Sequence, residues 1–330
     1  MFDLTIENKS FTCRPGETVL DALLRQNINI PHGCKAGACQ SCLVQSLDAK
    51  PPENAQRDLK DTLKHTGHFL ACQCHPQQPM TLRLSNQAVR FADGKVSINE
   101  PLNRNTHLLI IKINDADRYK YKAGQFVNLQ RYDGLTRSYS IANIPYASGT
   151  LEFHIRRLPG GRFSAWVHDE LKVGDSIRVS EPQGKCFYIP DRKEQGILLI
   201  GTGTGLAPLA GILTDALAQG HSGPISLYHG SRDYEDLYRI DEMRRLAERH
   251  PNFFYTPCVS SGDSPKDFIP GRANDAALSK HDNLANWRVF LCGHPEMVRT
   301  TQKQAYLKGA KLSDIYCDAF VVASENALHD

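Results

Sequence analysis

The sequence predicts a multidomain α+β and α/β protein built from three modules. These are a small cysteine-rich α+β module, an antiparallel β-barrel and a parallel, doubly wound sheet. Six of the ten cysteines lie within the first 74 residues. Short strand patterns separated by turns follow in the middle of the chain. Apolar strands then alternate with helices to the end. A length of 330 residues accommodates two or three domains of ordinary size.

Composition excludes several classes of function. The chain is 41% hydrophobic and 23% charged, as is usual for globular proteins. Its net charge of +3 is too balanced for a dedicated nucleic-acid or membrane-surface protein. No apolar run approaches the roughly 18 residues of a membrane span, and the N-terminus carries no secretory signal pattern. We therefore expect a cytoplasmic protein that binds no nucleic acid and has no membrane span.

The first module carries a cysteine pattern that suits an iron–sulfur cluster. Cys34, Cys39 and Cys42 have the spacing C-x4-C-x2-C, and Cys72 follows after 29 intervening residues. This is the spacing of plant-type ferredoxins, whose [2Fe-2S] cluster needs four thiolate ligands. Gly37 in the same loop lets the backbone approach the cluster. The pattern predicts a [2Fe-2S] site on these four cysteines.

A structural zinc site is the alternative. Zinc sites pair one C-x2-C with a second pair, whereas the second half here reads Cys72-Gln73-Cys74-His75. Cys74 could replace Cys72 as the fourth ligand, although the ferredoxin pattern favours Cys72. The surrounding pattern predicts strands at 4–7 and 10–13, a helix at 18–24 and a closing strand at 81–84. Strands with one helix and a cysteine loop are typical of a β-grasp ferredoxin.

The middle segment predicts a barrel. A polar stretch over about 85–95 is typical of a linker, and short strands separated by turns indicate an antiparallel barrel. The expected strands are 106–113, 125–130, 138–141, 150–156 and 176–180. Arg137 offers a planar fork of donors to a phosphate, and Tyr139 offers a ring to a flat heterocycle. Gly161 and Ser164, before a helix around 165–167, offer N–H groups to a pyrophosphate.

The last segment predicts a nucleotide-binding sheet. An apolar strand at 196–200 runs into Gly201-Thr202-Gly203-Thr204-Gly205 and a helix at 209–218. Strand, glycine loop and helix form the context that a dinucleotide requires. We expect further strands at 225–229, 253–259 and 289–292, and helices at 236–249 and 296–308. Cys292 ends a strand beside the glycine loop; a buried packing thiol is the alternative for it.

Together these motifs resemble the ferredoxin–NAD(P) reductase superfamily, in its three-module form. The resemblance implies a ferredoxin domain at 1–88, an FAD-binding barrel domain at 96–190 and an NAD(P)-binding domain at 191–330. The motifs that carry it occur in the family's order. They are the four cysteines, Arg137-Ser138-Tyr139-Ser140, Gly203-Thr204-Gly205-Leu206-Ala207-Pro208 and Cys292-Gly293-His294-Pro295-Glu296-Met297.

The resemblance also implies residue roles. Ser140 near the flavin N5 and Cys292 beside the nicotinamide are the expected catalytic residues. The expected cofactor-binding residues are Arg137, Tyr139, Ser140, Arg156, Gly161, Ser164, Gly203, Thr204, Gly205, Ser231, Arg232, Cys292, Gly293, Asp318 and Phe320. Asp318-Ala319-Phe320 is similar to a terminal acidic-x-aromatic element that closes over the flavin. Ten residues follow it here, and His294 stands where the family more often has Pro.

The implied activity is electron transfer from NAD(P)H through FAD to the cluster. NADH is the expected donor, and NADPH is possible because Ser231 and Arg232 suit a 2′-phosphate. The expected partner is a terminal oxygenase, either a dioxygenase or a monooxygenase. Two alternatives stay open: a reductase for another acceptor, such as a deoxysugar dehydratase, and a zinc-stabilised binding module on a reductase-like scaffold.

Overall fold

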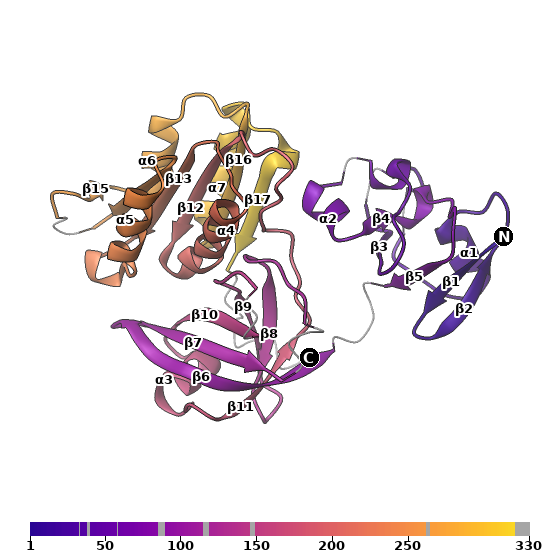
Figure 1. The fold of residues 1–330 in the computed structure, drawn as a ribbon, viewed down its shortest axis with the longest axis horizontal. Coiled ribbons are helices and arrows are strands. Elements are labelled where there is room, and N and C mark those ends of the chain that lie inside the picture. The colour runs from indigo at the N-terminus through magenta and orange to yellow at the C-terminus, as the bar shows by residue number, and fades with distance from the viewer. Residues whose placement is uncertain are drawn as a thin grey trace. The chain divides into compact units, whose positions relative to one another are not determined.

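The computed structural model describes two compact units, Met1–Val89 and Arg90–Asp330. Within them the described residues are 1–32, 34–37, 40–57, 59–84, 90–114, 119–145, 149–261 and 265–320. Cys39, one expected cluster ligand, and the ten residues after Phe320 lie outside these ranges. Figure 1 shows the helices and strands of each unit.

The first unit is a five-stranded mixed sheet with one main helix. Its strand order is β2-β1-β5-β3-β4. Helix α1 buries Val19, Leu20 and Leu23 in the core of the unit. This is the sheet-and-helix arrangement expected of a β-grasp module. The elements are β1 (Phe2–Ile6), β2 (Lys9–Cys13), α1 (Val19–Arg25), β3 (Leu43–Ser46), α2 (Asp61–His65), β4 (His68–Leu70) and β5 (Met80–Arg83).

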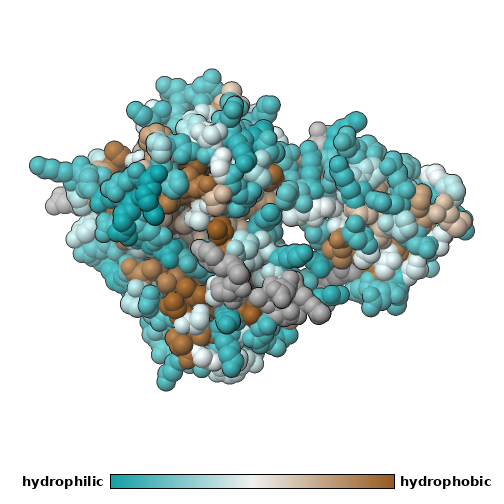
Figure 2. All heavy atoms as spheres, viewed as in Figure 1, coloured by the Kyte–Doolittle hydropathy of each residue, from teal (hydrophilic) through white to brown (hydrophobic). Residues whose placement is uncertain are grey.

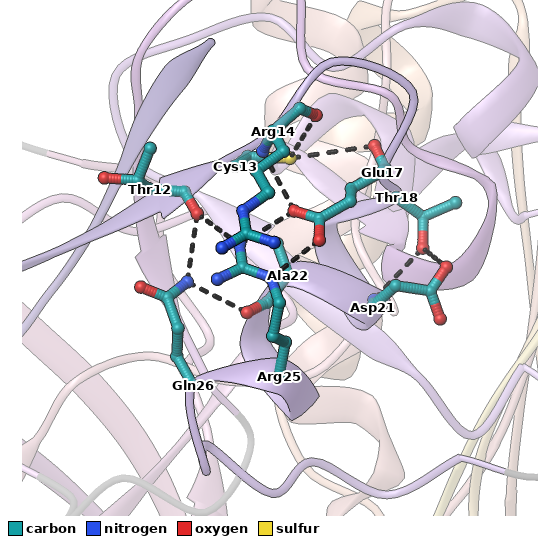
Figure 3. Close-up of polar contacts among 9 residues, drawn as sticks. All are labelled: Thr12, Cys13, Arg14, Glu17, Thr18, Asp21, Ala22, Arg25 and Gln26. Carbon is teal, nitrogen blue, oxygen red and sulfur yellow. Dashed lines mark hydrogen bonds and ion pairs between the residues drawn. The ribbon is translucent and has the colours of Figure 1, made fainter.

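A polar clamp fixes α1 against β2 (Figure 3). The Arg25 guanidinium donates to both Glu17 carboxylate oxygens, at 2.6 and 2.8 Å, and to the Thr12 carbonyl at 2.9 Å. This ion pair lowers the pKa of the Glu17 carboxyl to about 2. Thr18 caps the helix, since its hydroxyl accepts from the Asp21 N–H at 3.1 Å. The clamp joins the first hairpin to the helix that precedes the cysteine loop.

The second unit begins with a six-stranded antiparallel sheet of order β10-β7-β6-β11-β8-β9. Its edges meet where the Ala142 N–H donates to the Glu152 carbonyl at 2.9 Å. The strands are β6 (Phe91–Asn103), β7 (Thr106–Ile113), β8 (Phe126–Gln130), β9 (Thr136–Ser140), β10 (Thr150–Arg156) and β11 (Ser176–Ser180), with helix α3 (Arg162–Asp169). Residues 91–95, expected to lie in a linker, instead form the start of β6 and pair with β11.

A parallel sheet of order β15-β14-β13-β12-β16-β17 completes the unit. Its strands are β12 (Gly196–Thr202), β13 (Ile225–Ser231), β14 (Phe253–Val259), β15 (Ile269–Pro270), β16 (Trp287–Gly293) and β17 (Ile315–Ala319). Its helices are α4 (Leu206–Ala218), α5 (Ile240–Arg249), α6 (Ala273–Lys280) and α7 (Pro295–Leu307).

Each face of this sheet has its own core. Successive side chains of β12 point to opposite faces. Leu199 packs with α4 on one face, and Leu198 packs with α6 and α7 on the other. Helix α5 begins at Ile240 rather than at the expected 236, because Arg239 has a left-handed backbone with φ 56°. Helices on both faces confirm the predicted doubly wound sheet.

The surface agrees with the composition. Hydrophilic side chains dominate the face drawn in Figure 2, with small apolar groups between them. Within the part of the chain that the structure describes, no helix combines the length and apolar character needed to cross a lipid bilayer.

Candidate functional site

The cysteine loop of the first unit brings thiols toward one another. Cys42 and Cys72 are buried, at 3% and 6% exposure, and their thiols interact. Burial raises the pKa of the Cys42 thiol to about 11. Cys34 is exposed, and its sulfur accepts from the Ala36 N–H at 3.4 Å. N–H groups that point at a sulfur are the donors that a thiolate ligand needs.

The backbone of this loop suits close approach to a cluster. Lys35, Gly37 and Gln40 all have positive φ, at 51°, 82° and 54°. The Gln73 amide donates to the Cys72 sulfur at 3.5 Å and to the Lys35 carbonyl at 3.1 Å, so it ties the two parts of the ligand set together. Cys42 and Cys72 thus lie together, and Gln73 ties them to the loop that carries Cys34. Thiolates of this kind suit a [2Fe-2S] cluster. Within the residues that the structure describes, no three metal-ligating side chains are close enough to hold a metal ion.

Strand β9 presents the expected flavin-binding side chains. Arg137 is exposed, and its guanidinium donates to the Thr136 carbonyl at 2.8 Å. The Tyr139 ring lies 5.6 Å from the Phe163 ring at the start of α3. Burial raises the pKa of the Tyr139 hydroxyl, so this group stays neutral. The strand therefore offers the guanidinium of Arg137 and the ring of Tyr139 two positions apart, and this pair of groups fits a flavin nucleotide.

The start of α3 is built as a tight turn. A Cβ on Gly161 would lie 2.6 Å from the Ser164 hydroxyl. That hydroxyl accepts from the Leu158 N–H and donates to the Gly161 carbonyl, both at 3.1 Å. The Gly161 N–H donates to the Leu158 carbonyl at 3.0 Å. Gly161 and the Ser164 side chain thus shape the turn, and the N–H groups of 162–164 are the ones at the helix start.

The glycine loop sits between β12 and α4. Gly203–Gly205 form a single 3-10 turn, with Gly203 at φ 54°. A Cβ on Gly205 would collide with the Cys292 carbonyl, so only glycine lets this turn pack on the end of β16. The Arg156 guanidinium lies beside Gly203, 3.4 Å from where a Cβ would stand. The structure therefore brings Gly203, Gly205, Arg156 and Cys292 together.

Cys292 is wholly buried at the end of β16. Its sulfur lies 3.8 Å from the sulfur of Cys186. Burial raises the pKa of Cys292 well above the ordinary thiol value, so the group is a neutral thiol. Cys186 comes from the segment after β11, and sequence reasoning missed it because nothing in its local pattern marks it.

The last strand joins this site to the barrel. Asp318 of β17 stands opposite Cys292 in the parallel register. The Ser140 hydroxyl of β9 donates to the Asp318 carboxylate at 2.7 Å. The Phe320 N–H donates to the Gly293 carbonyl at 2.9 Å. Five residues expected at the site therefore converge at the ends of three strands.

A pocket of about 360 Å³ opens at the carboxyl ends of the parallel strands. Ser231 and Arg232 line it, as does Arg272 at the N-cap of α6, which sequence reasoning missed. Its other polar lining residues are Thr202, Ser260, Asn274, His294, Glu296 and Thr300. Its size and its mixture of cationic and hydroxyl groups fit part of a nucleotide.

These arrangements define a nicotinamide-nucleotide-dependent flavoprotein oxidoreductase with an iron–sulfur module. Residues 3–77 match the model of the 2Fe-2S iron-sulfur cluster binding domain. Residues 93–188 match the oxidoreductase FAD-binding domain, and residues 199–303 match the oxidoreductase NAD-binding domain. The chain belongs to the ferredoxin–NAD(P) reductase family in its three-module form.

Similar proteins span its whole length. The reductase subunit of an aromatic O-demethylase from Amycolatopsis sp. is 32% identical over 98% of this chain and 99% of its own. The terephthalate 1,2-dioxygenase reductase component 2 of Comamonas sp. is 31% identical over 94% of each chain. Among solved structures, an Amycolatopsis cytochrome P450 reductase is similar with a TM-score of 0.69 and 31% identity, covering 98% of this chain and 100% of that one.

Proposed function

We propose that this chain is the reductase component of an oxygenase system. In this role it oxidises NADH and passes electrons through FAD and a [2Fe-2S] cluster to a terminal oxygenase. When bound, FAD accepts a hydride from the dihydronicotinamide and gives up electrons one at a time to the cluster. Relatives named as reductase components of dioxygenase and monooxygenase systems support the partner class.

One observation carries the proposal. The Ser140 hydroxyl is bonded to Asp318, which stands opposite Cys292. Ser140 belongs to β9, the expected flavin-binding strand, and Cys292 lies at the carboxyl end of β16 in the nucleotide-binding sheet. The hydroxyl of one expected catalytic residue and the thiol of the other thus flank one carboxyl group. A flavin ring and a nicotinamide ring must meet for hydride transfer, and this is where their two binding elements meet.

The residues of the site have distinct roles in this proposal. Arg137 and the first turn of α3 hold the flavin pyrophosphate, and Tyr139 packs on the flavin ring. Ser140 positions a hydroxyl for the ring edge, with Asp318 fixing its direction. Gly203–Gly205 and Cys292 form the wall for the nicotinamide, and the neutral Cys292 thiol adds no charge there. Cys34, Cys39, Cys42 and Cys72 ligate the cluster. Phe320 closes the flavin side.

Metal and flavin analysis of the purified protein tests the prosthetic groups. The proposal expects about two irons and two acid-labile sulfides per chain, and one FAD. The visible absorption should bleach on addition of the reduced nucleotide under anaerobic conditions. A colourless protein that contains zinc would support the binding-module alternative instead.

The donor is NADH in this proposal, and NADPH is the second candidate. The two arginines of the nucleotide pocket, Arg232 and Arg272, favour NADPH because guanidinium groups bind a 2′-phosphate well. Glu296 in the same pocket opposes this, since its carboxylate repels phosphate. The ratio of kcat/KM for the two nucleotides decides between them. If the 2′-phosphate is bound, Arg232→Gln should weaken NADPH oxidation by about tenfold or more and leave NADH oxidation nearly unchanged.

The acceptor is tested by reconstitution with candidate partners. An oxygenase that turns over its substrate only when this reductase and the nucleotide are present supports the proposal. Turnover of a deoxysugar dehydratase instead would assign the alternative acceptor.

The proposed modules are 1–88, 96–190 and 191–330, although β6 begins at Phe91. The proposed compartment is the cytosol, where cysteines stay reduced, and no disulfide bridges those that the structure describes.

A further inference from the structure

Strand β10 has two different faces. Its odd-numbered side chains, Leu151, Phe153 and Ile155, pack in the barrel core. Three of its even-numbered side chains, those of Glu152, His154 and Arg156, contact the nucleotide module. Glu152 pairs with Arg239 at 2.7 Å, and Arg156 lies beside Gly203. Because successive side chains of a strand point to opposite faces, one strand serves both modules.

His154 is a buried, neutral link in this contact. Its Nε2–H donates to the Glu152 carboxylate at 3.1 Å. Its Nδ1 therefore has no proton and accepts from the Tyr238 hydroxyl at 2.9 Å. The His154 side chain has no exposed surface, and burial lowers its pKa. Glu152 thus fixes the tautomer of His154, and His154 fixes the position of Tyr238.

Tyr238 lies between two buried histidines. Its ring centroid is 5.2 Å from that of His154 and 5.6 Å from that of His229, both nearly perpendicular. His229 has no exposed surface either. Burial lowers the pKa of His229 to about 4, so it too is neutral. The three rings form a continuous packed row from the barrel to the inside of the nucleotide sheet.

His229 ends this row on the glycine loop. Its Nε2 lies 3.1 Å from the Gly203 carbonyl, and a carbonyl only accepts, so Nε2–H is the donor. The Tyr255 hydroxyl donates to the other ring nitrogen at 3.3 Å. The Gly203 carbonyl also accepts from the Leu206 N–H. This carbonyl therefore accepts two hydrogen bonds, which fix the orientation of the peptide group after Gly203. They also hold Gly203 itself in its left-handed backbone conformation.

We infer that His229 is a positioning residue, and that the row His154–Tyr238–His229 sets the Gly203–Gly205 loop relative to strand β10. The row acts on the place where the nucleotide is held, through one hydrogen bond to one carbonyl. His154, Tyr238 and His229 are not among the residues that line the nucleotide pocket. The inference rests on the proposed oxidation of a nicotinamide nucleotide. It adds three buried residues to which the sequence motifs assign no role.

The test compares His229→Leu with His229→Gln in the holoprotein. Leu removes the donor, whereas Gln keeps an N–H that reaches the Gly203 carbonyl. In His229→Leu, hydrogen–deuterium exchange of peptides covering 200–206 should speed up, and kcat with ferricyanide as acceptor should fall by about tenfold to a hundredfold. Binding of AMP should weaken less than kcat falls, because the row bonds to the Gly203 carbonyl, whereas the pocket is lined by its neighbours Ser231 and Arg232. In His229→Gln, exchange at 200–206 should return close to the wild-type rate, and most of the lost kcat should be restored.

His221→Leu is the matched control. His221 is another buried imidazole of the second unit, in the segment between α4 and β13, and the ring of Tyr188 lies 5.6 Å from it at 88°. Its hydrogen bond to the Tyr188 hydroxyl lies away from the glycine loop. This variant should leave exchange at 200–206 unchanged. A folded His229→Leu protein with wild-type exchange in that loop, or an equal kcat loss in His221→Leu, overturns the inference.

A second pair covers the case in which His229→Leu does not fold. Gln and Asn both place an amide at position 229, but only Gln has the length to reach the Gly203 carbonyl. Slower exchange and higher kcat in Gln than in Asn support the inference, and equality contradicts it. Loop exchange is measured without any nucleotide. A protein that oxidises neither NADH nor NADPH would therefore disprove the proposed donor while the exchange result still decides the role of His229.

Discussion

The Ser140 hydroxyl donates to the Asp318 carboxylate at 2.7 Å, across 178 positions of the chain. This bond ties the end of a barrel strand to the last strand of the parallel sheet. Burial raises the pKa of Asp318, and the bond from Ser140 partly offsets that rise. The protonation of Asp318 is therefore sensitive to the loss of the hydrogen bond from Ser140.

Ser140→Ala should therefore change both stability and pH dependence. Losing a donor to a buried carboxylate costs about 1–3 kcal/mol in free energy of unfolding. It also raises the pKa of Asp318 further, so the acid limb of the nucleotide oxidation profile should move to higher pH. Stopped-flow measurement of flavin reduction across pH checks this. Ser138→Ala is the control, because the Ser138 hydroxyl on the same strand donates to the Asn128 side chain and not to Asp318. An equal shift in this variant would contradict the prediction.

Gly205→Ala should destabilise the second unit. The added Cβ would collide with the Cys292 carbonyl, and backbone cannot yield as a flexible side chain can. Overpacking of this kind costs about 1–3 kcal/mol. Thermal unfolding of Gly205→Ala should show a lower midpoint than that of Thr204→Ala, which changes the same turn without adding an atom. Equal midpoints would argue that the loop relaxes at no cost.

Mild acid should lower the free energy of unfolding of the second unit, because His229 is buried in its neutral form. His229 has a pKa of about 4 when folded and 6.5 as its ordinary value. Below 6.5 the unfolded chain takes up a proton that the folded chain does not, so stability falls as pH drops toward 4. The shift corresponds to about 3 kcal/mol at full protonation of the unfolded state. Denaturant unfolding at pH 7.5 and pH 5 measures it, and His229→Gln should lose much of this dependence.

Cluster loading should distinguish the four expected ligands from their neighbours. Replacing Cys34, Cys39, Cys42 or Cys72 by Ser should abolish the [2Fe-2S] cluster, since serine is a poor substitute for a thiolate. Cys74→Ala should keep about two irons per chain. Cys74 is a fully buried packing thiol whose pKa burial raises to about 12. Iron and sulfide assays of each variant give the answer, and a loss of iron in Cys74→Ala would move the fourth ligand to that position.

Much of the architecture follows from local pattern. Strands 106–113, 150–156, 176–180 and 253–259 are predicted with the bounds that the structure shows. In each, turn or polar residues end a β-rich run. The start of β6 is missed because Asp93-Gly94-Lys95 has the pattern of a turn, and the strand there depends on pairing with β11. The late start of α5 is missed because nothing in the local sequence indicates the left-handed backbone of Arg239 at the N-cap.

The site is predictable only where a motif marks it. The cysteine loop, Ser140, Gly205 and Cys292 each stand in a recognisable pattern. His154 and Tyr238 do not, because a polar residue at an even position of β10 is ordinary for an outward-facing side chain. Their hydrogen bond joins residues 84 positions apart. Local sequence carries no signal for such a pair, which depends on how the two sheets pack.

The two-faced strand β10 limits how this reductase can be recombined. A chimera that joined its barrel to a foreign nucleotide module would keep Glu152, His154 and Arg156 while losing Arg239 and Tyr238. An ionised carboxylate buried without its counter-ion costs several kcal/mol. Successful exchange of modules would thus require grafting the matching side chains along with the new sheet, and a cut made at the apparent boundary in the chain would divide a single cooperative interface.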